Sequence, residues 1–345
     1  MSIRIAIDVM GGDHAPGAIV DGCIEALASL GENDTLVLIG PEDIVRSALT
    51  KKGVDDPRLE IAHASEAIPM GASPTVAVRQ MPDSSIVKMA KLGSKKADIR
   101  CDAVLSAGNT GACVAAGQMH MKRLTGVHRP GIAVTFPSFH GPVVLCDAGA
   151  NPEPRATHLW QYGIMADIYA KRVLNIESPR VGLMNIGSEE GKGSVLARET
   201  AEMLKRTPGI NYIGYIEGRD VFGGTADVIV TDGFVGNTVL KMAEGFAKSI
   251  FQAIAQEIFA HDPKLAMQFE PIVKQIYKKN DYHEYGGAPL LGVNGVMMIA
   301  HGTSEARTID NAIRNTLEYV RGHVNDEIVQ RLSRLTEIEH REPAS

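Results

Sequence analysis

Short apolar runs alternate with segments of helical spacing along most of this chain of 345 residues. The first apolar runs lie at residues 3–9, 36–39 and 59–62, and the segments at 18–30 and 42–52 repeat apolar residues every three or four positions. Short apolar runs indicate strands, whereas spacing of three and four indicates helices. Strands that alternate with helices in this way predict a mostly parallel sheet with helices on both faces.

The alternation continues to residue 323. The pattern predicts further strands at 103–105, 132–136, 143–146, 180–184, 212–216 and 227–230. It predicts further helices at 84–96, 111–120, 154–173, 194–205, 235–260, 265–279 and 302–323. Pro263 separates the two helices on either side of it, because proline cannot continue a helix. The polar tail from residue 337 is expected to fray.

These elements predict a three-layer α/β/α architecture in a single domain over residues 1–345. A subdivision near residue 150 is only weakly marked, and a helical protrusion is expected over 239–280. The chain has no internal repeat, low-complexity stretch or clear linker.

Six glycine-rich turns carry polar side chains, and several of them follow a predicted strand. They lie at residues 8–14, 106–111, 147–151, 185–193, 231–237 and 285–289. Loops at the carboxyl ends of strands in an open α/β sheet gather in one crevice. Glycine lets the backbone approach a ligand closely, and consecutive N–H groups attract anions. The turns therefore predict a shared site for phosphate or carboxylate.

Composition limits the class of protein. Hydrophobic residues make up 44% and charged residues 22%, which is typical of a soluble globular chain. Aromatic residues make up only 5%, so we expect an aliphatic core. The formal net charge of -6 argues against general nucleic-acid binding, and any acidic partner must find a local basic patch.

The cysteines indicate a reducing, cytoplasmic environment. All four lie in apolar stretches and none forms a C-x-x-C pair, so we expect reduced core residues. Arg4 and Asp8 interrupt any N-terminal apolar segment, which argues against a signal peptide. No apolar run is long enough to span a bilayer.

Several motifs together resemble one enzyme family. The chain reads IAIDVMGGDHAP at 5–16, SAGNTGA at 106–112, NIGSEEGKG at 185–193, TDGFVGN at 231–237 and YGGAPLLG at 285–292, with EGRD at 217–220 and HGTS at 301–304. This set resembles the bacterial phosphate acyltransferases of phospholipid synthesis. The resemblance runs from residue 3 to about 322, which is nearly the whole chain.

The resemblance implies a fold like that of isocitrate and isopropylmalate dehydrogenases, in a homodimer. It implies acyl transfer from acyl carrier protein to inorganic phosphate, which gives acyl phosphate and a free thiol. A membrane-embedded glycerol-3-phosphate acyltransferase would then use the product. The family is expected to need no nucleotide or metal, and to act in the cytoplasm or peripherally at the inner face of the cell membrane.

This chemistry needs an anion site more than a nucleophilic side chain, because phosphate is itself the nucleophile. The loop 185–193 offers turn N–H groups at Gly187, the hydroxyl of Ser188 and the ammonium of Lys192 just before a helix. Glu189 and Glu190 would repel an anion unless they turn away or orient Lys192. The alternative is that Lys192 is an ordinary solvated surface residue.

Asn109, Thr110, Asp232 and Asn237 follow predicted strands and are candidates for binding substrate or the developing oxyanion. Removal of one oxyanion donor typically costs roughly 3 kcal/mol of activation barrier. The alternative is helix capping, for which Asn, Asp and Thr are preferred. Asn237 lies too far into the next helix to be a good cap, which favours a role in the site.

Histidine suits general acid–base work, so His14 and His301 are candidates, with capping or core roles as the alternative. Asp8 and Asp13 are expected to fix a loop or to pair with Arg219. The remaining candidates for close backbone approach to phosphate or substrate are Gly11, Gly12, Gly286 and Gly287. No motif has metal-ligand spacing, so no metal site is predicted.

Two surfaces suggest partners. Lys88, Lys91, Lys95 and Lys96 lie along one side of a predicted helix, where an acidic carrier protein could dock; the alternative is a solvated face. An apolar stripe at steps of three and four follows the helix 235–260, at Val239, Met242, Phe246, Ile250, Ile254 and Ile258. This stripe predicts core or dimer contact, with bilayer contact near 251–269 as the alternative.

Two other functions fit the same class of fold. A nicotinamide-dependent dehydrogenase would require a dinucleotide fingerprint, and Gly11-Gly12-Asp13-His14 does not match G-x-G-x-x-G. A non-catalytic scaffold at a membrane surface would leave the polar glycine turns without a purpose.

Overall fold

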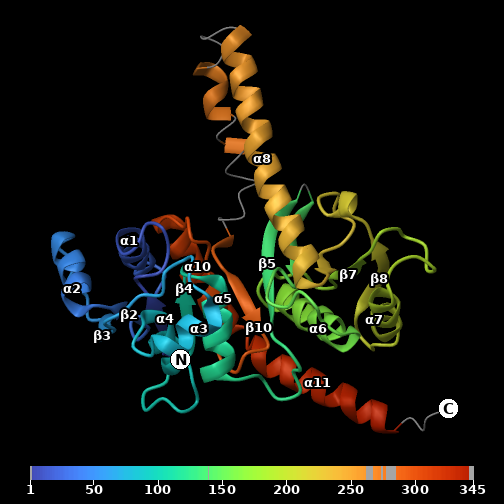
Figure 1. Ribbon diagram of the computed structural model, residues 1–345, viewed down its shortest axis with the longest axis horizontal. Helices are drawn as coiled ribbons and strands as arrows, with labels where there is room; N and C mark the ends of the chain where they lie inside the picture. The colour runs from blue at the N-terminus through green and yellow to red at the C-terminus, as the bar shows by residue number, and fades with distance from the viewer. Residues whose placement is uncertain (1, 139, 262–266, 273–274, 277–284, 342–345) are drawn as a thin grey trace.

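A single twisted sheet runs through the molecule, as the computed structural model in Figure 1 shows. The structure describes residues 2–138, 140–261, 267–272, 275–276 and 285–341. The strand order is β3-β2-β1-β4-β11-β10-β5-β6-β9-β7-β8. The strands are β1 (Arg4–Asp8), β2 (Thr35–Gly40), β3 (Leu59–His63), β4 (Ala103–Ser106), β5 (Gly131–Ser138), β6 (Gly141–Cys146), β7 (Arg180–Met184), β8 (Asn211–Ile216), β9 (Val228–Val230), β10 (Ala288–Leu291) and β11 (Val296–Ile299).

The sheet consists of two parallel sets joined by antiparallel strands. β3, β2, β1, β4 and β11 are parallel to one another, and so are β6, β9, β7 and β8. Between the sets, β10 pairs antiparallel with β11 and with β5, and β5 pairs antiparallel with β6. The two parallel sets therefore point in opposite directions, and their carboxyl ends do not share one edge.

Helices cover both faces of this sheet. The helices are α1 (Gly17–Ala26), α2 (Glu42–Lys51), α3 (Pro74–Gln80), α4 (Ser85–Leu92), α5 (Thr110–Ala116), α6 (Ala156–Arg172), α7 (Val195–Lys205), α8 (Gly233–His261), α10 (Ala306–Arg321) and α11 (Val324–Arg341), with a π-helical turn η1 (Gly117–Met121) and a 3-10 turn η2 (Gly218–Asp220). The predicted three-layer, mostly parallel α/β/α architecture is confirmed.

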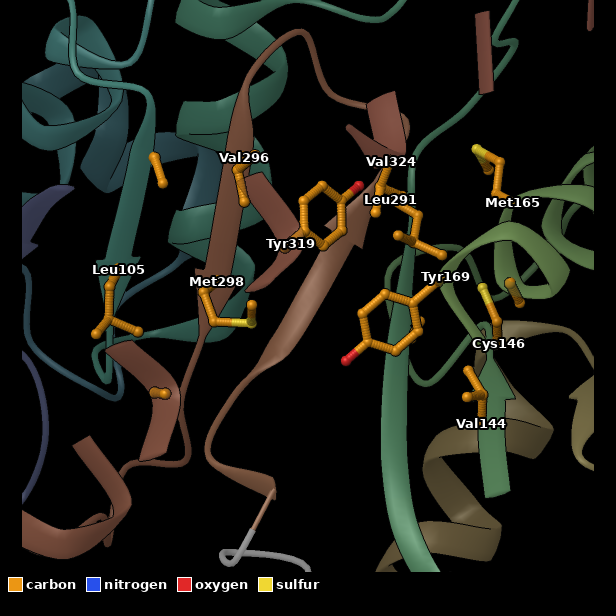
Figure 2. Packing of buried hydrophobic residues seen from close by; sticks show 14 of the residues in the cluster. Leu105, Val144, Cys146, Met165, Tyr169, Leu291, Val296, Met298, Tyr319 and Val324 are labelled. Carbon is orange, nitrogen blue, oxygen red and sulfur yellow. The ribbon is translucent and has the colours of Figure 1, made fainter. Parts of the chain in front are cut away.

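Alternate residues of the strands face the two helical layers. Ile5 and Ile7 of β1 pack in the core beside α1 and α10, whereas Ala6 between them packs in the core beside α3, α4 and α5. The first of these cores continues across both parallel sets. Tyr169 of α6 and Tyr319 of α10 are buried at its centre, with ring centroids 6.0 Å apart (Figure 2).

The four cysteines are all buried and free, as the sequence predicted. Burial raises the pKa of the thiols of Cys23, Cys113 and Cys146. These residues therefore belong to the core.

Four elements were not predicted: α3, β10, β11 and α11. The expected fraying from residue 337 is contradicted as far as Arg341, where α11 ends, and residues 342–345 lie outside the described residues. The predicted helices 84–96 and 302–323 are shorter, since α4 ends at Leu92 and α10 at Arg321. Of the predicted helix 265–279, residues 267–272 and 275–276 are helical, and the rest lies outside the described residues.

The helix α8 extends well beyond the body of the molecule (Figure 1). Only Gly233 and Gly236, in its first turn, are buried. Val239 of the predicted stripe packs against the core, but among the described residues the stripe beyond it is not core. Met242 and Phe246 are 69% and 71% exposed, and Ile250 and Ile254 are 43% and 40% exposed.

Candidate active site

Two loops of the candidate site are each held by a buried carboxylate at the end of a strand. Asp8, the last residue of β1, is fully buried, and its Oδ2 accepts a hydrogen bond of 2.7 Å from the hydroxyl of Ser106 at the end of β4. The amide of Met10 donates to Asp8 Oδ1 at 3.0 Å. Burial raises the pKa of Asp8, and hydrogen bonds from Ser85 and Ser106 oppose that effect. The pair Asp8–Ser106 thus ties the two glycine turns together.

Asp147 organises the turn that follows β6. Its Oδ1 accepts hydrogen bonds from the amides of Gly149 and Ala150 at 3.1 and 3.0 Å, and its Oδ2 accepts from the amide of Asn151 at 2.7 Å. The amide of Ala148 donates instead to the carbonyl of Ile132 at 2.9 Å. The N–H groups of this turn are therefore already used, and they are not available to bind an anion.

The start of α8 lies directly on this turn. A Cβ atom at Gly236 would lie 2.0 Å from the carbonyl oxygen of Asp147, and one at Gly233 would lie 2.8 Å from that of Asn151. Only glycine permits such a close approach of backbone to backbone. The contact places Asn237 beside Gly149, whose own ideal Cβ position is 3.6 Å from the Cβ of Asn237.

A cavity of about 780 Å³ lies between these loops, the helix α5 and the strand β5. Its lining includes the apolar residues Val114, Met119, Ile132, Val134, Leu240 and Ile299. It also includes the polar residues Asp13, Thr110, Gln118, Thr135, Asn237, Lys241, Tyr285 and His301. A cavity of this size, lined by both apolar and polar side chains, can hold an elongated ligand that has an apolar chain and a polar end.

Lys241 and His301 meet at the polar part of the cavity. Lys241 Nζ lies 3.4 Å from His301 Nε2 and forms an ion pair of 3.0 Å with Glu244. The amide of Thr303 donates to His301 Nδ1 at 3.3 Å, which orients the ring. Lys241 follows Asn237 by four residues, so both side chains project from the same face of α8.

Five of the predicted candidates line the cavity: Thr110, Asn237, Gly286, Gly287 and His301. Gly286 has a φ of +83°, and a Cβ atom there would lie 2.3 Å from the amide nitrogen of Ala312. These glycines therefore let the chain pass between the cavity and α10.

The other predicted residues do not line this cavity. Gly11 packs against the backbone of Gly108, where a Cβ atom would lie 2.6 Å from the amide nitrogen. Gly12, with a φ of +106°, packs near the carbonyls of Ala107 and Gly302. His14 is exposed near the start of α1, and Asp13 lines the cavity in its place.

Asn109 and Asp232 make the hydrogen bonds of helix caps. Asn109 Oδ1 accepts from the amide of Ala112, and its Nδ2 donates to the carbonyls of Met70 and Ala72. Asp232 Oδ1 accepts from the amide of Val235 at 2.8 Å. For both residues the contacts favour the capping alternative.

The loop 185–193 lies outside the cavity lining. Lys192 is exposed and pairs with Glu189 at 2.7 Å, while Glu190 pairs with Lys205. Gly187 is buried under the Lys192 side chain, and Ser188 is exposed. Five of the six glycine turns contribute residues to the lining, including those after β6 and β9 of the second parallel set, whereas the loop after β7 in that set does not. The expected pairing of Asp8 or Asp13 with Arg219 is wrong, since Arg219 pairs with Glu217.

Lys241 is the main residue that sequence reasoning missed. The helix 235–260 was interpreted through its apolar stripe, and its polar residues were not examined for the same spacing. The i, i+4 pair of Asn237 and Lys241 was the available signal. Among the described residues that line the cavity, Lys241 is the one lysine or arginine.

Within the described part of the chain, no three His, Cys, Asp or Glu side chains gather closely enough to hold a metal ion. None of the described helices has the length and apolarity needed to cross a membrane.

Comparison with known proteins shows the family to which the chain belongs. The family model described as "Fatty acid synthesis protein" matches residues 3–327. The chain belongs to this family. Relatives from Dictyoglomus turgidum and Desulfitobacterium hafniense, each named phosphate acyltransferase, are 40% and 44% identical to it over 338 residues. The alignments cover 97% of this chain and 99% of each relative, so the chain is an acyltransferase.

Solved structures share the fold. A phosphotransacetylase from Streptococcus pyogenes superposes with a TM-score of 0.62 at 17% identity, covering 93% of this chain and 94% of the other. A protein described as a 4-hydroxythreonine-4-phosphate dehydrogenase from Salmonella typhimurium gives a TM-score of 0.51 at 16% identity, covering 92% and 99%. The predicted dehydrogenase-like fold is confirmed.

Proposed function

We propose that this acyltransferase moves a fatty acyl group from the thioester of an acyl carrier protein to inorganic phosphate, giving acyl phosphate. The observation that carries the proposal is one cavity whose lining combines an apolar wall of buried side chains with the polar group Lys241, His301 and Asn237. An acyl chain needs the first and an anionic nucleophile needs the second.

The apolar wall would hold the acyl chain. It is formed by α5, β5 and the end of β11, and its residues Val114, Ile132 and Ile299 are at most 9% exposed. Burial of each CH₂ group of an acyl chain would contribute about 0.8 kcal/mol. This hydrophobic contribution supports an acyl chain as the ligand that contacts the apolar wall.

The polar end would hold phosphate and the thioester carbonyl. Lys241 supplies a compact positive charge for phosphate, and the amide of Asn237 can donate to the carbonyl oxygen as it becomes negative. A phosphate oxygen forms the new bond to the carbonyl carbon, the C–S bond breaks, and the sulfur leaves as a thiolate that takes up a proton. His301, beside Lys241, is placed to take the proton of hydrogen phosphate and to return it to the sulfur.

The remaining partners follow from the family resemblance. We propose a homodimer that acts in the cytoplasm and supplies acyl phosphate to a membrane-embedded glycerol-3-phosphate acyltransferase. The exposed apolar residues of α8, Phe259 among them, and the exposed Met267 and Phe269 after this helix support contact with a second copy or with the bilayer surface.

The test is release of thiol from a long-chain acyl carrier thioester, with and without phosphate, in metal-free buffer. We expect phosphate-dependent release with acyl phosphate as the product. Lys241→Met and Asn237→Ala should each reduce kcat about 10²-fold or more, because each removes a donor at the reacting centre.

Two lysine variants provide the comparison. Lys248→Met changes an exposed lysine two turns farther along α8 and should leave turnover unchanged. Lys192→Ala decides between the two phosphate sites. If Lys192→Ala abolishes turnover and Lys241→Met does not, phosphate binds at the loop 185–193 and the assignment to the cavity is wrong. No release from the wild type would overturn the proposed reaction itself.

A further inference from the structure

A second cavity, of about 730 Å³, is basic although the chain as a whole is acidic. Its lining includes Lys88 and Lys91 of α4, Lys96 just beyond that helix, and His120 and Lys122 at the end of η1. Asp83 and Asp98 also line it, so four lysines face two carboxylates. Such a local excess of positive charge attracts an acidic partner and raises its rate of association.

The basic cavity shares a wall with the first cavity, of about 780 Å³, which is called the acyl cavity from here on. Met119 of η1 lines both, its neighbour Gln118 lines the acyl cavity, and His120 lines the basic one. The turn is a π-helix closed by a hydrogen bond of 3.0 Å from the amide of Lys122 to the carbonyl of Gly117. Single π-helical turns are frequent at functional sites.

Lys122 is held in an unusual conformation at this wall. Its φ of 70° and ψ of -168° lie in a region that residues other than glycine rarely adopt. A glycine at this position would avoid the strain but would remove the ammonium group from the cavity. Burial lowers the pKa of His120, and the nearby charges of Lys91 and Lys122 lower it further. The positive charges of α4 and η1 therefore act on the same space.

An apolar side chain lies at the same surface. Ile99 lines the basic cavity and is 66% exposed, and Leu92 and Met119 line the cavity as well. Charged residues around a small apolar centre are the usual anatomy of a protein-binding surface, whereas a site for a small anion needs no apolar centre. The lining therefore favours an acidic protein over a free anion.

We infer that the basic cavity is the docking site of the acyl carrier protein, whose acidic surface contacts Lys88, Lys96 and Lys122 while its thioester arm passes the turn Gly117–Met121 into the acyl cavity. This inference rests on the proposed function, since that function supplies the carrier as the donor. To the proposed function it adds the surface on which the carrier docks, the side from which the thioester arm enters the acyl cavity, and the residues that select a protein-bound donor.

The test compares a protein-bound donor with a small one. The charge reversals Lys96→Glu and Lys122→Glu are measured with acyl carrier thioester and with the same acyl group on free pantetheine. With the carrier, KM should rise about tenfold or more at unchanged kcat, and the rise should shrink at high salt. With acyl pantetheine, kcat/KM should stay within about twofold. Lys51→Glu, at an exposed lysine at the end of α2, is the matched control and should leave KM and kcat unchanged with either donor.

A titration of the carrier without turnover separates this inference from the proposed reaction. We expect holo-carrier protein to bind the wild type and the Lys51→Glu variant, and to bind Lys96→Glu and Lys122→Glu at least tenfold more weakly, whether or not acyl phosphate forms. Equal binding to all four proteins, or no binding to the wild type, would overturn the inference. A rise in KM for phosphate instead of the carrier would show that the cavity binds a small anion.

Discussion

Two glycines in the first turn of α8 determine where the side chains of the candidate site lie. Gly233 and Gly236 allow the helix to rest on the turn 147–151, and Asn237 and Lys241 project from the same helix. Asp147 fixes the turn 147–151, because its carboxylate accepts hydrogen bonds from three backbone amides of that turn. The site thus depends on backbone contacts that tolerate no added methyl group.

Gly236→Ala should therefore damage both stability and turnover. The added Cβ would meet the carbonyl oxygen of Asp147 at 2.0 Å, so helix and turn must separate. We expect a loss of roughly 1–3 kcal/mol in the free energy of unfolding, as for other overpacked sites. A displacement of Asn237 by about 1 Å should cost on the order of 10²-fold in kcat. Chemical denaturation and thiol release measure the two effects.

Gly245→Ala is the control for this substitution. Gly245 lies in the same helix, and no atom lies within 4 Å of its ideal Cβ position. The change should leave turnover intact and stabilise the helix by up to about 1 kcal/mol. Full activity in Gly236→Ala would mean that the contact between α8 and the turn does not position the site.

Individual site residues could be predicted from the sequence only where the local pattern excluded a structural role. Asn237 was selected because it lies too deep in a helix to cap it, and it does line the cavity. Asn109 and Asp232 fitted capping and catalysis equally well in sequence, and only their hydrogen bonds separate the two. Lys192 has glycine neighbours that suggest an anion loop, but whether the loop 185–193 reaches the cavity depends on the tertiary arrangement of the strands.

At the scale of elements, one ion pair links two neighbouring strands of the second parallel set, β7 and β9. Arg180, the first residue of β7, donates to Asp227, the residue before β9, through its amide, Nε and Nη2, at 2.8, 3.0 and 2.8 Å. Burial raises the pKa of Asp227, but the hydrogen bonds from Arg180 outweigh this and hold it below its ordinary value of 3.8. The folded chain therefore favours the charged carboxylate.

Asp227→Asn should lower the free energy of unfolding at neutral pH by about 1 kcal/mol, since the pair is partly exposed. A carboxylate whose pKa is lowered by folding stabilises the folded chain at pH values above its pKa in the unfolded chain. This stabilisation is lost as the pH falls through the pKa in the folded chain. The difference in the free energy of unfolding between wild type and variant should thus reach its full size above about pH 5 and shrink below pH 3.8. Urea denaturation at several pH values measures it.

Asp55→Asn, at an exposed carboxylate, should change stability by less than about 0.5 kcal/mol at any of these pH values. A difference between wild type and Asp227→Asn that stayed constant from pH 7 to pH 3 would show that the effect is one of packing and not of charge.

Long elements with a clear period were predictable, and the missed ones are short or interrupted. The strands β10 and β11 have four residues each, and Pro289 argues against a strand because it cannot donate to a ladder. The structure tolerates this proline because Ala288 and Pro289 pair with β11, while Leu290 and Leu291 pair with β5. This change of partner within one strand could not be inferred from apolar spacing.

At the scale of the whole molecule, most of the apolar stripe of α8 is left exposed by the described residues. Its members Met242 and Phe246 lie close to the cavity residue Lys241 in sequence, and more than two thirds of each side chain is exposed. Exposed apolar residues at helical spacing favour an interface over a solvated helix.

Phe246→Glu should therefore weaken the proposed homodimer, because it places a charge in an apolar interface. We expect the dissociation constant to rise about tenfold or more in sedimentation experiments, with the wild type sedimenting at twice the mass of one chain. Lys248→Glu, at a polar position of the same helix, should leave the mass unchanged. A wild type that sediments as a monomer, together with loss of liposome binding in Phe246→Glu, would assign the stripe to a membrane surface instead.

The protruding segment leaves and rejoins the body at neighbouring points. Asn237, near the beginning of α8, and Tyr285, after the last gap in the described chain, line the same cavity. The described part of α8 beyond Lys241 therefore extends away from the rim of this cavity (Figure 1). Substitutions along that part of the helix can change what it contacts without displacing a strand of the sheet, so partner choice and chemistry are separable.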